Sequence, residues 1–416
     1  FGQDPRKVDY AKVFNNRRPV LEKAVKRFLE CGDLAAYEKF VADNSSWLEV
    51  FVEYMAIKEY FDLKAWTEWP DAALRRREAA SLAHYREKLA DRLTYHRVTQ
   101  YLFFKQWLEL KAYANEHYIE IVGDMPIYVA ADSCDVWAQP HFFKTDELGQ
   151  PTCVAGCPPD EFSATGQLWG NPIYDWKAMD KDGYSWWIKR LRESFKIYDV
   201  VRIDHFRGFE SYWEIPAGSD TAAPGKWVKG PDYALFKAVK EELGDLNIIA
   251  EDLGFMTDEV IALREKTGFP GMKVTQFAFN PDSESIDSPH LAPNNSVMYT
   301  GTHDNNTVLG WYRDEIDDAT REYMAQYTNR KEYETVPHAM LRTIFASVSF
   351  MAIATMQDLL ELDGSARMNY PSTIGGNWSW RMTADELNPV VEAELYSLTK
   401  TYRRVNKKLL NHENEL

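Results

Sequence analysis

The sequence predicts an α/β protein whose strands form a parallel (β/α)8 TIM barrel with helical and loop insertions. Short apolar runs alternate with helical segments, and this alternation implies a parallel sheet. Three of the runs end in carboxylates, where the C-terminal mouth of a barrel carries its active site. The expected strands cover residues 119–124, 199–204, 247–251, 272–279, 297–302 and 350–356.

The N-terminal part of the chain predicts helices instead of strands. Residues 1–17 read as a loop, and Leu21, Val25 and Phe28 keep helical spacing in the segment that follows. We therefore expect a helical insertion subdomain over 18–115 of a single catalytic barrel domain, 1–416. Residues 130–175 are rich in Gly, Pro and Asp without periodicity, which predicts an active-site loop insertion.

Between the strands, four helices are expected over residues 183–198, 232–243, 257–267 and 333–347, and the chain from 382 to 416 reads as helical. A closed barrel needs two more strands than the six counted. Because the upstream chain is helical, either the barrel is irregular or the chain lacks its N-terminal part, including the first barrel strands.

Composition excludes several classes of partner. The chain has 48 basic and 64 acidic residues, so its net charge of −16 argues against nucleic acid and anionic membrane surfaces. No uncharged apolar stretch is long enough to span a membrane. The four cysteines and the histidines lack metal-ligand spacing, so the cysteines are expected to be free thiols in a reducing compartment, with no metal or cofactor. The 14 Trp and 23 Tyr favour a large core over sugar stacking.

The three strand ends supply the candidate chemistry. Residues two apart on a strand face the same side, so Arg202 points with Asp204 and favours its ionised form, as a nucleophile requires. Glu251 ends a more apolar strand, where desolvation would raise its pKa and suit a general acid. Asp304 follows His303 and could orient sugar hydroxyls. Together they predict a glycosidic-bond site; the alternative is that each acid caps a helix.

Two aromatic segments fit the same chemistry. GQLWGNP (166–172) contains Trp169 and Asn171, and NYPSTIGGNWSW (369–380) combines Asn, Trp and Tyr with Gly. Both could be ordinary turns. Both would also suit the polar rim of a saccharide site, with a flat ring over a sugar.

Long motifs then reveal a resemblance. VGDMPIYVAADSCDVWA, VAGCPPDEFSATGQLWGNPIYDW, VVRIDHFRGFESYWEIPA, AEDLG, GFPGMKVTQFAF, YTGTHDNNTVLGWYR and ARMNYPSTIGGNWSWR span residues 119–381. In this order they resemble the 4-α-glucanotransferases of the amylomaltase, or disproportionating enzyme, family. The resemblance implies transfer of an α-1,4-glucan segment from maltooligosaccharide, starch or a glycogen-derived glucan to another glucan or glucose, without a cofactor.

The resemblance also implies residue roles. Asp204 would be the nucleophile of a retaining reaction, Glu251 the acid and base, and Asp304 the stabiliser of the transition state. The loop at 156–167 resembles a lid that excludes water, and the bacterial-looking helical region favours the cytoplasm, or a plastid in a plant. The family's sugar-binding positions correspond to Arg202, His205, His303, Asp124, Asp160, Gln167, Trp169, Phe277 and Asn369.

The chain departs from the family pattern in two places. Glu161 stands where members carry Tyr or a small residue, which puts an aromatic contact of the lid in doubt. The family's opening segment, with the first barrel strand and a Gly-Asp-Ser-Pro-Tyr-Gln run, has no counterpart here, so we expect this chain alone to fold poorly and to be inactive. The competing readings are an α-amylase-type hydrolase on the same barrel and a non-catalytic binding barrel.

Overall fold

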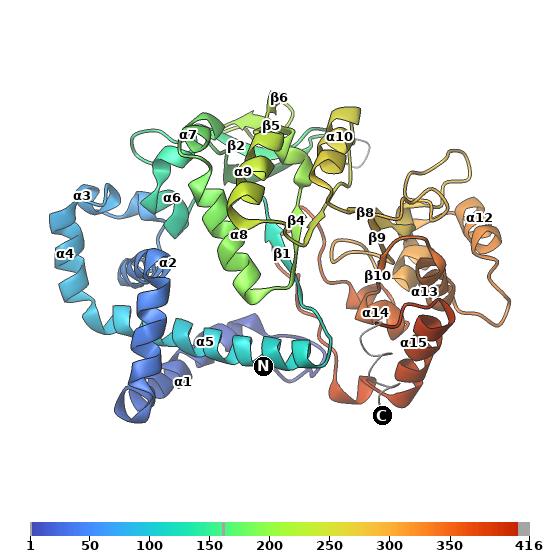
Figure 1. The fold of residues 1–416 in the computed structure, drawn as a ribbon, viewed down its shortest axis with the longest axis horizontal. Helices are drawn as coiled ribbons and strands as arrows, with labels where there is room; N and C mark the ends of the chain where they lie inside the picture. Colours follow the sequence, from blue (N-terminus) through green and yellow to red (C-terminus); the bar gives the residue numbers. More distant parts are fainter. Residues whose placement is uncertain (1, 160–162, 407–416) are drawn as a thin grey trace. The chain divides into compact units, whose positions relative to one another are not determined.

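The computed structural model describes residues 2–159 and 163–406 (Figure 1). The chain divides into two compact units. Unit 1 consists of Phe1–Arg17, Ile249–Phe255 and Gly268–Leu416, and unit 2 of Arg18–Ile248 and Met256–Thr267. The single barrel domain with insertions at 18–115 and 130–175 stays a prediction.

The region predicted as helical, 18–115, is helical, but its first helix begins at Tyr10, so the prediction of a loop over 1–17 was wrong for residues 10–17. It contains α1 (Tyr10–Cys31), α2 (Leu34–Tyr60), α3 (Ala72–Arg75), α4 (Ala79–Lys88) and α5 (Ala90–Glu116). Asp33 begins α2 by accepting a hydrogen bond from the Ala36 amide, as expected of an N-cap. Apolar residues at helical spacing meet in a small core of Val25, Tyr95 and Val98, so the periodicity read from the sequence reflects real packing.

All six predicted parallel strands are present, although shorter than expected. They are β1 (Val122–Pro126), β4 (Val200–Asp204), β7 (Ile248–Ala250), β8 (Gly271–Val274), β9 (Ser296–Tyr299) and β10 (Met351–Ile353). They lie in two three-stranded sheets with the orders β1-β4-β7 and β10-β9-β8. The pairs β1–β4, β8–β9 and β9–β10 are parallel. A mixed α/β fold is therefore confirmed.

The expected strand at 272–279 ends at Val274, and residues 275–277 form a short 3-10 helix. The remaining α-helices are α6 (Cys134–Ala138), α7 (Trp176–Lys181), α8 (Ser185–Ile197), α9 (Tyr233–Leu243), α10 (Asp258–Thr267), α11 (Val308–Gly310), α12 (Asp318–Thr328), α13 (Val336–Ala346), α14 (Met356–Leu359) and α15 (Pro389–Thr401). The predicted helices over 183–198, 232–243, 257–267 and 333–347 correspond to α8, α9, α10 and α13.

The segment 130–175 is more ordered than its composition predicts. It contributes β2 (Cys153–Cys157) and β3 (Gln167–Pro172) to an antiparallel sheet with β5 (Ser211–Pro216) and β6 (Lys226–Lys229), in the order β3-β2-β5-β6. A Cβ on Gly156 would lie 2.1 Å from the Gln167 carbonyl oxygen, so this close backbone approach requires glycine. The glycines that suggested a loop thus serve a sheet.

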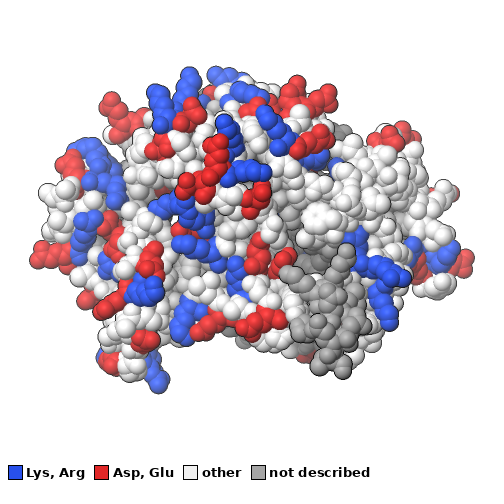
Figure 2. Space-filling model, viewed as in Figure 1, with Lys and Arg blue, Asp and Glu red and all other residues white. Residues whose placement is uncertain are grey.

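Charge is mixed over the face drawn in Figure 2, where Lys and Arg lie among Asp and Glu. None of the four cysteines forms a disulfide, as predicted. Within residues 2–159 and 163–406, no helix is both long enough and apolar enough to cross a membrane.

Candidate functional site

Arg202 joins two carboxylates at the end of β4 in unit 2. The parallel register places Asp124 of β1 opposite Arg202, and the side chains form an ion pair of 2.6 Å between Asp124 Oδ1 and Nη1. The other guanidinium nitrogen, Nη2, lies 3.1 Å from Asp204 Oδ1. Arg202 is 11% exposed, whereas Asp124 and Asp204 are 46% and 44% exposed. The predicted period-two pairing of Arg202 with Asp204 is confirmed, and a partly buried cation holds an accessible carboxylate.

His205 and Trp169 extend this group, which we name the Asp204 cluster (Asp124, Trp169, Arg202, Asp204 and His205). His205 follows β4 in a left-handed backbone conformation, φ 54° and ψ 49°. Its ring meets Trp169 edge to face, with centroids 4.8 Å apart. Trp169 Nε1 in turn donates to Gln167 Oε1 at 3.1 Å. Burial, aided by the nearby Arg207 charge, lowers the pKa of His205 to about 4, so its imidazole is neutral at pH 7.

A second group lies in unit 1, and we name it the Asp304 cluster (His303, Asp304, Arg367, Asn369 and Trp378). Asn369 Nδ2 donates to Asp304 Oδ1 at 2.6 Å, and His303 Nε2 lies 3.4 Å from Asp304 Oδ2. The Asn369 amide also donates to the His303 carbonyl oxygen at 3.1 Å. These bonds fix a carboxylate that is 46% exposed, so one of its sides remains open to a ligand.

Sequence reasoning missed two members of this cluster. Arg367 Nη2 donates to the Asp304 carbonyl oxygen at 2.7 Å, and its Nε donates to the Asn369 carbonyl oxygen at 2.9 Å. The Trp378 ring lies 5.1 Å from the His303 ring and is 45% exposed. Both residues lie in the quoted motif ARMNYPSTIGGNWSWR, but neither was assigned a role from the sequence.

Glu251 lies in unit 1 at the end of β7 and is 9% exposed. Its Oε1 accepts a hydrogen bond from the Leu253 amide at 2.9 Å, which fixes one carboxylate oxygen. Phe277, also in unit 1, is 48% exposed and lies in the 3-10 helix after β8 instead of in the strand. Asp160 lies outside the described residues.

Helix capping does not account for the three acids. The 3-10 helix after β4 is preceded by His205, and α11 is capped by Thr307, whose hydroxyl accepts from the Gly310 amide. After Glu251 the next helix, α10, begins only at Asp258. Asp204 ends β4 and Glu251 directly follows β7, whereas Asp304 lies in the loop after β9, which ends at Tyr299 instead of reaching residue 302 as predicted. None of these carboxylates caps a helix, so all three are available for chemistry.

No group of three or more His, Cys, Asp or Glu that could hold a metal ion occurs in the part of the chain that the structure describes. The chemistry of both clusters is that of carboxylates, amides, imidazoles and aromatic rings. Such groups exchange hydrogen bonds with hydroxyls and cover the apolar faces of sugars.

Comparisons with known proteins agree with this chemistry. A family model described as 4-alpha-glucanotransferase matches residues 2–387. A 4-alpha-glucanotransferase of Streptococcus pneumoniae serotype 4 is 78% identical over 99% of this chain and 81% of its own length. One from Thermus thermophilus is 44% identical over 96% of this chain and 81% of its own length.

A solved structure is similar throughout. The amylomaltase from Streptococcus agalactiae in complex with acarbose superposes with a TM-score of 0.95 at 48% identity. The similarity covers 98% of this chain and 82% of that one.

Proposed function

The chain belongs to the 4-alpha-glucanotransferase family, and from this premise we propose how its residues transfer a segment of an α-1,4-glucan to another glucan or to glucose. The observation that carries the proposal is the accessible Asp204 carboxylate held by a partly buried arginine, Arg202. The hydrolase alternative is not favoured, because the relatives that match across the chain are named as transferases.

Asp204 is the proposed nucleophile. The Arg202 guanidinium 3.1 Å away favours the ionised carboxylate, which is the form that attacks. The carboxylate oxygen bonds to the anomeric carbon as the glycosidic bond breaks, so a covalent glucosyl-enzyme forms with inverted configuration. A second displacement by the acceptor hydroxyl restores the original configuration.

Glu251 is the proposed acid and base. It gives its proton to the leaving glycosidic oxygen in the first step and takes a proton from the acceptor hydroxyl in the second, so it returns to its starting state. The hydrogen bond from the Leu253 amide to Oε1 supports a fixed orientation of this carboxyl group.

Asp304 is the proposed stabiliser of the transition state. With Oδ1 held by Asn369, its remaining lone pairs can accept hydrogen bonds from sugar hydroxyls that strengthen as the ring distorts. His303 and the neutral His205 supply further sugar contacts, and the rings of Trp169 and Trp378 offer apolar faces to glucose units. Asp160, Gln167 and Phe277 remain binding candidates by resemblance.

We also propose a closed (β/α)8 barrel for the family fold to which this chain belongs. The six strands at the predicted positions and the similarity to a solved amylomaltase support it. The cytoplasmic setting and the maltodextrin donors and acceptors stay predictions.

Incubation with maltotriose tests the function and, at the same time, the expectation from the sequence that residues 1–416 alone are inactive. Transfer converts two maltotriose molecules into glucose and maltopentaose, and longer products follow, whereas hydrolysis gives only glucose and maltose. Asp204→Asn should abolish product formation, and Asp245→Asn, which changes an acid that is 87% exposed, should not. Products no longer than the substrate would refute transfer.

A further inference from the structure

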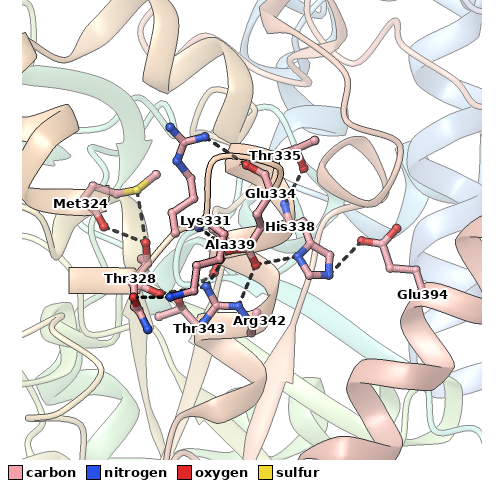
Figure 3. A network of polar contacts seen from close by, with 12 residues as sticks. Met324, Thr328, Lys331, Glu334, Thr335, His338, Ala339, Arg342, Thr343 and Glu394 are labelled. Carbon is pink, nitrogen blue, oxygen red and sulfur yellow. Dashed lines mark hydrogen bonds and ion pairs between the residues drawn. The ribbon is translucent and has the colours of Figure 1, made fainter. Parts of the chain in front are cut away.

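Unit 1 contains a cavity that is lined mainly by charged and polar residues and shares no residue with the Asp304 cluster. It lies beside the turn between α12 and α13 and faces a side chain of α15, as the close-up shows (Figure 3). Its volume is about 620 Å³. Small-molecule sites occupy roughly 300–1,000 Å³, so the cavity has the size for a ligand of a few sugar units.

The wall of the cavity is held by a network around Glu334. Arg342 donates from Nε to Glu334 Oε1 at 2.7 Å and from Nη2 to Oε2 at 2.9 Å. His338 Nδ1 lies 2.8 Å from Glu334 Oε1, and its Nε2 lies 3.7 Å from Glu394 Oε1. The hydrogen bonds from Arg342 hold the pKa of the Glu334 carboxyl at about 2. Polar groups are therefore fixed in place before any ligand arrives.

The cavity is lined by charges of both signs. Three carboxylates, Glu334, Glu361 and Glu394, line it together with the cations Lys331 and Arg342. The carboxylates would repel an anionic ligand, and Lys331 and Arg342 would repel a cationic one. A neutral ligand with many hydroxyls fits best, because each hydroxyl can donate to a carboxylate and accept from a cation.

Tyr333 adds an apolar surface to this polar wall. It lines the cavity, and it is 90% exposed although it stands beside the buried Glu334. An aromatic ring left in water at the edge of a hydroxyl-binding cavity offers a flat face to the C–H side of a pyranose.

We infer that this cavity is a second glucan-binding site, in which Tyr333 stacks on a glucose unit while the accessible side chains of His338, Arg342 and Glu394, held in place around the buried Glu334, bind its hydroxyls. The inference rests on the proposed function for the class of sugar, an α-1,4-glucan. Such a site would retain long glucans at the enzyme without taking part in bond exchange. It should therefore matter for glycogen and not for maltotriose.

The test compares wild type with Tyr333→Ala, Tyr333→Phe and the matched control Tyr113→Ala, which removes a ring that is 61% exposed in α5. Migration in native gels with increasing glycogen gives a dissociation constant, and glucose release from maltotriose gives kcat/KM. Tyr333→Ala should weaken glycogen binding about fivefold, in the range of an aromatic contact. Tyr333→Phe and Tyr113→Ala should bind like wild type, and kcat/KM for maltotriose should be unchanged in all.

Three outcomes would overturn the site: unchanged glycogen binding in Tyr333→Ala, equal weakening in Tyr333→Phe, or a parallel loss of maltotriose turnover. Because Tyr333 is exposed, misfolding of the variant is not expected, and a melting curve checks it. The wild-type protein could bind glycogen through Tyr333 and yet fail to disproportionate maltotriose. That result would refute the proposed function but support the second glucan-binding site.

Discussion

Arg367 provides the sharpest test of how the Asp304 cluster is assembled. Its guanidinium donates to the carbonyl oxygens of Asp304 and Asn369, and Nη1 lies 3.2 Å from Glu315 Oε1. The side chain is 15% exposed, so water can replace these contacts only in part. Arg367→Met keeps much of the length and removes all three polar contacts at once.

The expected loss can be worked out from these contacts. Hydrogen bonds to charged groups contribute about 1.5–3 kcal/mol each, so losing the two to carbonyl oxygens should lower the free energy of unfolding by about 3 kcal/mol or more. A displacement of a catalytic group by about 1 Å costs about 100-fold in rate. We therefore expect kcat for maltotriose disproportionation to fall about 100-fold, with a smaller change in KM.

Arg404→Met is the matched control. Arg404 also lies in unit 1 and donates to backbone carbonyl oxygens, those of Phe345, Ser347 and Ser349, away from the Asp304 cluster. It should lower stability in urea by a similar amount and leave kcat of the folded fraction within about twofold, since no catalytic group depends on it. Folded Arg367→Met with wild-type kcat, or an equal loss of kcat in Arg404→Met, would refute the reasoning.

Three further predictions concern the proposed acid, the arginine bridge and acid stability. Glu251→Gln should slow transfer from maltotriose about 1,000-fold, yet a maltosyl fluoride donor, which needs no proton on its leaving group, should still release fluoride rapidly in a burst assay. Asp124→Asn should lower kcat/KM about tenfold, because it removes one of the carboxylates paired with Arg202; unchanged kcat/KM would contradict this. His205 has a pKa of about 4 when folded and about 6.5 when unfolded, so protonation of the unfolded chain should remove about 3 kcal/mol of stability as pH falls from 6.5 to 4. Urea titrations at pH 7 and 4.5 should show a smaller loss of unfolding free energy in His205→Asn than in wild type. An identical loss would contradict the role of His205 in acid stability.

The strands and their terminal acids could be predicted because they depend on local pattern. The predicted runs around β4 and β9 are apolar, and Val201 and Val297 are fully buried, so burial and sequence agree. The period of two along β4 was enough to pair Arg202 with Asp204. Where one strand contains both partners, sequence spacing determines the contact.

The contacts that could not be predicted join distant parts of the chain. Asp304 and Arg367 are 63 residues apart, and the bond is made to a backbone carbonyl, which no side-chain pattern reveals. The pairing of β2 with β5 matches Val154 to Ile215 across a similar separation. These strands were not predicted because glycine usually indicates a loop. In this sheet, Gly156 is needed because the backbone of β3 lies too close to it for a side chain.

The arrangement around Arg202 has a consequence for the proposed two-step reaction. When Asp204 forms the glucosyl ester, it loses its negative charge while Arg202, 11% exposed, keeps its positive one. A buried cation that loses its counter-ion is costly. Asp124, 2.6 Å from the same guanidinium, retains its charge through both steps and stabilises the arginine in the intermediate. In the proposed reaction, the paired strands β1 and β4 therefore supply both the carboxylate that reacts and the carboxylate that balances the charge of Arg202 while it does so.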